Sequence, residues 1–93
     1  MKEFRTKNEL VVQSSDGVFV AYDAVKGDIL ELNEVGFRVV RACASPNTVG
    51  GVCGELEQEC TDLPPRCELE KDVYNFLIEL ENCGFVTGQF VSS

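Results

Sequence analysis

The sequence of 93 residues predicts one small α+β domain, in which a three-stranded antiparallel sheet is followed by three helices. Two observations lead to this fold class. The first 32 residues contain three short runs of β-branched, aromatic and aliphatic residues, separated by turn sequences. From Asn33 to Gly84 the apolar residues recur instead at helical spacing.

The strand-like runs cover residues 10–13, 18–22 and 28–32. Asp16-Gly17 is a favoured two-residue hairpin turn, and a second turn is expected around Lys26-Gly27, so the three strands should form a meander. Residues 1–8 are polar and of mixed charge. We expect them to be a flexible lead-in to a single domain spanning residues 9–91.

Three helices are expected between Asn33 and Gly84. Asn33 can cap the first helix, which is broken at residues 45–47, and Thr48 can cap the second. Three glycines weaken the second helix by about 1 kcal/mol each relative to alanine. The third pattern begins at Leu69 and ends at Gly84, a typical left-handed C-terminal cap.

The end of the chain after Gly84 is again strand-like. Residues 85–86 and 90–91 are apolar and are separated by Thr87-Gly88-Gln89. This pattern indicates a short terminal strand pair, or wing.

The cysteines do not follow the spacing of a metal site. There are five, no two form a Cys-x-x-Cys pair, and no histidine can complete a zinc site. An odd count without a signal peptide also argues against a secreted disulfide scaffold. We interpret most of these thiols as small buried apolar side chains, with Cys67 as the exposed one. A Cys60–Cys67 bridge and an iron–sulfur site are the alternatives.

Charge and composition exclude several classes of function. Sixteen acidic and eight basic residues give a net charge of −8, and residues 47–93 alone carry −7, which is the wrong sign for binding phosphates. Histidine, the commonest general base, is absent, and no catalytic constellation is found. No apolar run can span a bilayer. We therefore expect a cytoplasmic, non-catalytic binding module without metal, cofactor, nucleic acid or membrane.

Three sequence segments in a fixed order resemble those of a known family. They are GDILELNEVG at residues 27–36, TV at 48–49, and DVYNFLIEL at 72–80 closing with CGFV at 83–86. Over residues 9–86 this pattern resembles the PqqD-like family, small proteins also described as RiPP recognition elements. The glycine-rich second helix and the five cysteines depart from the family pattern.

The resemblance implies a winged helix-turn-helix-like arrangement of the sheet and the three helices. It also implies a peptide chaperone of natural product biosynthesis, which binds the leader segment of a ribosomally made precursor peptide. Such proteins present the leader to a modifying enzyme, often a radical SAM enzyme. The leader typically adds as a strand beside the third strand and lies against the third helix.

The residues support such a site independently. The third strand lies at a sheet edge and can pair with an extended peptide. On the third helix, Tyr74 and Ile78 extend the apolar surface beyond the core stripe, on the flank that carries Glu81. The alternative is that the sheet or the wing covers this flank. The predicted peptide-binding residues are Asp28, Ile29, Leu30, Glu31, Leu32, Val73, Tyr74, Phe76, Leu77, Ile78 and Glu81.

Two other functions compete with leader binding. A winged-helix nucleic-acid-binding regulator would need a basic recognition helix, but the last helix has Lys71 among four acidic residues between positions 70 and 81. A cysteine-based metal or redox protein is the third possibility. The exposed edge strand permits either a monomer or a homodimer.

Overall fold

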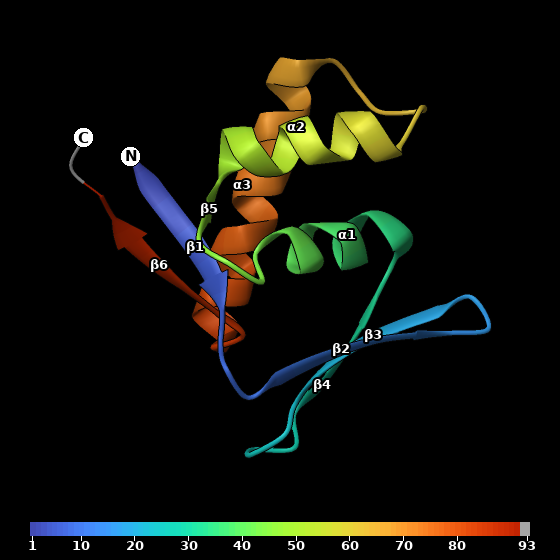
Figure 1. The fold of residues 1–93 in the computed structure, drawn as a ribbon, viewed down its shortest axis with the longest axis vertical. Helices are drawn as coiled ribbons and strands as arrows, with labels where there is room; N and C mark the ends of the chain where they lie inside the picture. The colour runs from blue at the N-terminus through green and yellow to red at the C-terminus, as the bar shows by residue number, and fades with distance from the viewer. Residues whose placement is uncertain (92–93) are drawn as a thin grey trace.

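The computed structural model describes residues 1–91. Its elements form two three-stranded antiparallel sheets and three helices (Figure 1), which confirms the α+β class and the three-stranded sheet followed by three helices. In chain order they are β1 (Lys2–Thr6), β2 (Leu10–Ser15), β3 (Val18–Asp23), β4 (Ile29–Leu32), α1 (Glu34–Ala42), β5 (Asn47–Thr48), α2 (Val49–Glu59), α3 (Arg66–Cys83) and β6 (Val86–Phe90).

The first sheet is the predicted meander, with strand order β2-β3-β4. Asp16 and Gly17 have φ angles of 53° and 79°, and two positive values in succession are what a two-residue type I′ hairpin turn requires. One face of this sheet packs on α1 and the core. The side chains on this inner face are Leu10, Val12, Phe19, Ala21, Leu30 and Leu32.

The second sheet has the order β5-β1-β6 and was not predicted. Residues 2–6 are its central strand, and Phe4 is fully buried in the core, so the prediction of a flexible lead-in is wrong. The predicted terminal strand pair is also wrong, because β6 is one continuous strand that pairs with β1. Both errors have one cause: each segment finds its partner at the opposite end of the chain.

The helix boundaries follow the predicted caps. The side-chain oxygen of Asn33 accepts a hydrogen bond from the backbone N–H of Gly36 at 2.7 Å, and that of Thr48 accepts one from Gly51 at 3.1 Å. Gly84 ends α3 in the left-handed conformation, with φ of 84°. These local signals fix where α1, α2 and α3 lie in the chain.

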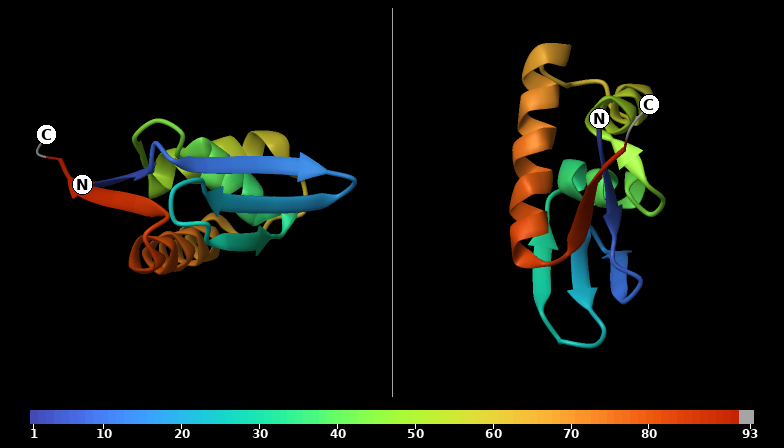
Figure 2. Two further views of the ribbon diagram at one scale, coloured as in Figure 1. Left: turned by 90° about the horizontal axis from the view of Figure 1, so that it is seen from below. Right: turned by 90° about the vertical axis from the view of Figure 1, so that its left-hand side faces the viewer.

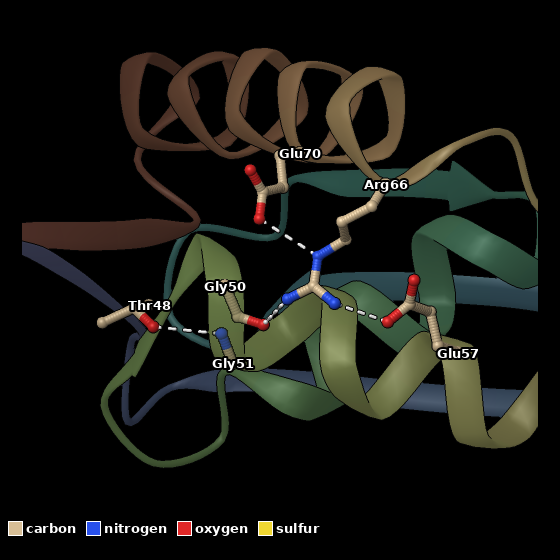
Figure 3. A network of polar contacts seen from close by, with 6 residues as sticks. All are labelled: Thr48, Gly50, Gly51, Glu57, Arg66 and Glu70. Atoms are coloured by element: carbon tan, nitrogen blue, oxygen red, sulfur yellow. Dashed lines mark hydrogen bonds and ion pairs between the residues drawn. The ribbon is translucent and has the colours of Figure 1, made fainter.

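Arg66 is the first residue of α3, which begins three residues before the predicted Leu69, and it links α3 to α2. Its guanidinium donates a hydrogen bond to the carbonyl oxygen of Gly50 at 3.0 Å and forms ion pairs with Glu57 and Glu70 (Figure 3). The pair with Glu70 has the i, i+4 spacing that stabilises a first helical turn. The first turn of α3 therefore holds α2 in place.

The five cysteines all carry free thiols. Cys43 and Cys53 are buried, Cys60 is partly buried, and Cys67 and Cys83 are exposed, so the prediction that most are buried is wrong, whereas exposure of Cys67 is confirmed. Burial raises the pKa of Cys43 to about 12 and also raises the pKa of Cys53. Both buried thiols are therefore neutral at physiological pH.

No cluster of three or more potential ligand side chains is arranged to hold a metal ion among residues 1–91. Among the helices described, none combines the length and the apolar character needed to cross a membrane.

Candidate functional site

The outer edge of β4 is free of any partner strand among residues 1–91. β4 lies at one end of the order β2-β3-β4 and pairs only with β3 in the described structure. It is also the strand of this sheet that lies on the side of α3 (Figure 2). An unpaired edge beside a helix can accept an additional strand.

The hydrogen bonds between β3 and β4 show which residues of β4 face this free edge. Asp23 and Asp28 lie opposite each other just before Ile29, and the N–H of Asp23 donates to the carbonyl oxygen of Asp28 at 2.9 Å. Hydrogen-bonded and non-hydrogen-bonded pairs alternate along an antiparallel ladder. The two leucines of β4 therefore bond to β3, and Ile29 and Glu31 direct their N–H and C=O groups outward.

Phe76 connects α3 to the end of β4. A Cβ atom added at Gly36 would lie 3.3 Å from the ring atom Cζ of Phe76 and 3.7 Å from Cδ2 of Leu32. An alanine at this position of α1 would pack tightly against the ring of Phe76, which would have to shift by a few tenths of an ångström. Gly36 therefore lies next to both Phe76 of α3 and Leu32 at the end of β4.

An apolar cavity of about 280 Å³ lies beside this contact. It is bounded by the start of α1, the loop at residues 62–64 and the first half of α3, and Asn33, which directly follows β4, lines it. The free edge of β4 therefore leads to the cavity. Its lining residues are Asn33, Val35, Gly36, Val39, Asp62, Leu63, Pro64, Leu69, Asp72, Val73 and Phe76.

The charged side chains on β4, directly before it and in the cavity lining are all acidic. Asp28 and Glu31 lie exposed on or next to β4, and Asp62 and Asp72 line the cavity. No lysine or arginine lines the cavity. The site therefore combines an apolar floor with an acidic rim, which favours apolar ligands that carry positive charge.

A buried ion pair holds the turn between β3 and β4. The carboxylate of Asp23 is 2% exposed and lies 2.5 Å from the ammonium nitrogen of Lys7; it also accepts backbone N–H bonds from Val25 and Lys26. The hydrogen bond from Lys7, and after it that from Lys26, lowers the pKa of Asp23 to about 2. This pair fixes the start of β4 to the segment that joins β1 and β2.

The predicted site residues fall into two groups. In the first group, residues 28–32 form or adjoin β4, and Val73 and Phe76 line the cavity. Leu77 is fully buried in the core, so its side chain supports the groove without reaching its surface.

Tyr74 and Glu81 lie on the opposite flank of α3, so the prediction that they line the same groove is wrong. Glu81 accepts a hydrogen bond from the ammonium of Lys2 on β1 at 3.0 Å, and Tyr74 lines a shallow hollow with Met1 and Phe4. Ile78, one turn after Tyr74, is partly buried against the core. The second sheet contacts this flank at Glu81, through Lys2, whereas Tyr74 remains exposed beside the hollow.

Sequence reasoning missed the residues that close the cavity. Val35 and Gly36 belong to the first turn of α1, and Leu63 and Pro64 to the loop before α3. An apolar Val35 in the first helical turn and an apolar Leu63 in an otherwise polar loop were the available signals. Neither signal indicates by itself that the two segments meet.

The chain matches one family model and is similar in fold to three solved chains, two of which are given below. The family model described as "Coenzyme PQQ synthesis protein D (PqqD)" matches residues 10–86. A solved structure titled "Lasso peptide synthetase B1 complexed with the leader peptide" is 23% identical, with a TM-score of 0.72, and the match covers 89% of this chain and 95% of that one.

A second solved structure, "TbiB1 in Complex with the TbiA(beta) Leader Peptide", is 18% identical with a TM-score of 0.74, and the match covers 95% of this chain and 99% of that one. No curated protein matches the chain. At these identities the two structures establish a shared fold.

Proposed function

Because this chain belongs to the PqqD family, we propose that it is a non-catalytic protein that binds the leader segment of a ribosomally synthesised precursor peptide. The observation that carries the proposal is the unpaired edge of β4, with the outward backbone groups of Ile29 and Glu31, beside an apolar cavity. The two solved proteins of similar fold were each determined with a leader peptide.

The leader adds as a fourth strand along β4 and lies against α3. Pairing with Ile29 and Glu31 supplies backbone hydrogen bonds that demand little of the peptide sequence. A strand that continues past Leu32 arrives at the cavity lined by Val35 and Phe76, where an apolar side chain can be buried. The acidic rim then selects leaders with a lysine or arginine near this apolar residue.

The bound leader is presented to a separate modifying enzyme, such as a radical SAM protein. The chain itself needs no metal or cofactor for this role, because strand pairing and apolar burial are sufficient for binding. Its acidic surface opposes the competing nucleic-acid-binding function, since α3 carries Glu and Asp side chains along its length and its Arg66 is engaged by two carboxylates.

The proposal is tested by titrating a synthetic peptide of the cognate leader sequence against Glu31→Pro. Proline removes one outward N–H, and proline is tolerated on an edge strand where that group faces solvent, so the fold should persist. We expect affinity to fall by about tenfold or more, which corresponds to about 1.4 kcal/mol.

Glu31→Ala is the matched control, because it removes the same carboxylate and keeps the N–H. It should bind within about threefold of the parent, less than about 0.7 kcal/mol. If Glu31→Pro melts as the parent does and binds the leader equally well, the peptide does not add to this edge.

A further inference from the structure

The sheet β2-β3-β4 has a second face, which no described helix or strand covers. Figure 1 shows α1 on one side of this sheet only, and the left view of Figure 2 looks onto the other side. Val18 and Ile29 on this outer face are 51% and 74% exposed. The apolar side chains that alternate onto the outer face are Val11, Val18, Val20, Tyr22 and Ile29.

These five side chains do not contribute to the core. The core cluster and the residues packed against it take the inner-face positions of the same three strands and none of these five. The outer face of the second sheet is polar by contrast, with Glu3 and Arg5 on β1 and Thr87 and Gln89 on β6. Gln13, Ser15 and Glu31 share the outer face of the first sheet, but Tyr22 has Val11 and Ile29 on its two sides, and Val20 and Val18 continue the apolar row along β3. An apolar row on one sheet and a polar face on the other indicate a contact surface.

Charge restricts what can cover the outer face. The sequences of β2, β3 and β4 contain no lysine or arginine, and Glu9, Asp16, Asp28 and Glu31 lie on or around them. Lys26, in the turn before β4, extends its ammonium to within 3.9 Å of a Cβ built on Gly84. The complementary surface is therefore apolar with lysine and arginine around it, whereas a second copy of this chain, with net charge −8, would be repelled.

We propose that this outer face docks the enzyme that modifies the peptide, through an apolar patch of that enzyme flanked by basic residues. The inference rests on the proposed function. Ile29 and Glu31 place their side chains on the outer face and direct their backbone groups to the free edge. A leader strand paired with β4 therefore widens the same face, and a docked enzyme contacts protein and peptide together.

The test uses the purified enzyme that modifies the cognate peptide and the double variant Val18→Lys/Val20→Lys. Both changes lie on the central strand β3, one strand away from the peptide edge, so they oppose docking without touching the leader. We expect enzyme affinity, measured without peptide, to fall about tenfold or more, and leader affinity to stay within about twofold.

Thr87→Lys/Gln89→Lys is the matched control, because it adds the same charge to an outer strand face of the other sheet. It should bind the enzyme within about twofold of the parent. Thermal melting of both variants verifies that they are folded.

Two results overturn the inference: an enzyme that binds Val18→Lys/Val20→Lys as tightly as the parent, or one that does not bind the parent. A parent that sediments as a dimer and a variant that sediments as a monomer would also overturn it, since the face would then join two copies. The enzyme titration contains no peptide, so its result does not depend on leader binding. If the parent does not bind the leader, that result counts against the proposed function and not against this inference.

Discussion

The two flanks of α3 differ in what covers them. Toward β1 and β6 the helix is held by its own chain, with the ion pair between Lys2 and Glu81 spanning the contact. Toward β4 the described structure leaves an unpaired strand edge and an apolar cavity. Exposure of an apolar side chain does not distinguish the two flanks, since Tyr74 is 46% exposed on the flank toward β1. The open flank is recognised by its unpaired backbone groups.

The largest expected effect is the difference in leader affinity between Phe76→Ala and Tyr74→Ala. Phe76 lines the cavity and lies next to Gly36 of α1, so its truncation should weaken leader binding about a hundredfold, close to 3 kcal/mol. Tyr74→Ala should change leader affinity by less than about twofold. Titration of the leader peptide against both variants, with thermal melting alongside, decides the assignment, and a greater loss for Tyr74→Ala would move the site to the other flank.

The second expected effect is on the pH dependence of stability and concerns Asp23, at the turn between β3 and β4. The pKa of Asp23 is lowered to about 2, so its ionised form stabilises the fold above the unfolded value near 4, and this contribution is lost as the pH falls from about 4 to about 2. Asp23→Asn lacks the contribution at every pH. The melting temperatures of parent and variant should therefore differ most near pH 6 and converge toward pH 2, and a constant difference would contradict this role.

The smallest effect is expected on the covered flank. A Cβ at Gly88 would lie 2.4 Å from Cε of Lys2 and 2.6 Å from Oε2 of Glu81, so Gly88→Ala displaces the ends of two flexible side chains. Loss of this partly exposed ion pair should cost no more than about 1 kcal/mol of unfolding free energy. Denaturant unfolding measures the cost, and leader affinity should not change. A loss of leader binding would show that the two flanks are coupled.

The sequence was informative wherever structure is local. The meander, the caps at Asn33, Thr48 and Gly84, and the free third strand all follow from turn and capping residues a few positions apart. β1 could not be found in this way, because Phe4 is its only fully buried side chain and its partners are remote in the chain.

The error at Tyr74 follows from the missing strand. Without β1, an apolar side chain beside the core stripe of α3 indicates an open surface, and the prediction placed it in the peptide groove. The cavity was missed for a related reason, since it forms only where Val35 meets the loop around Leu63. Predicting such a meeting requires the tertiary arrangement of α1 and α3.

The pairing of β1 with β6 also has a consequence for folding kinetics. Lys2 lies opposite Phe90, 88 positions away in the chain, whereas the hairpins of β2, β3 and β4 close over a few residues. Closing a long loop costs more conformational entropy than closing a short one, and this cost precedes the favourable contacts. Contacts between residues far apart in the sequence therefore slow folding. During synthesis β1 leaves the ribosome first but cannot pair with β6 until the last strand is made. We therefore expect the sheet β5-β1-β6 to be completed last, after the strand edge that we propose as the leader site has already formed.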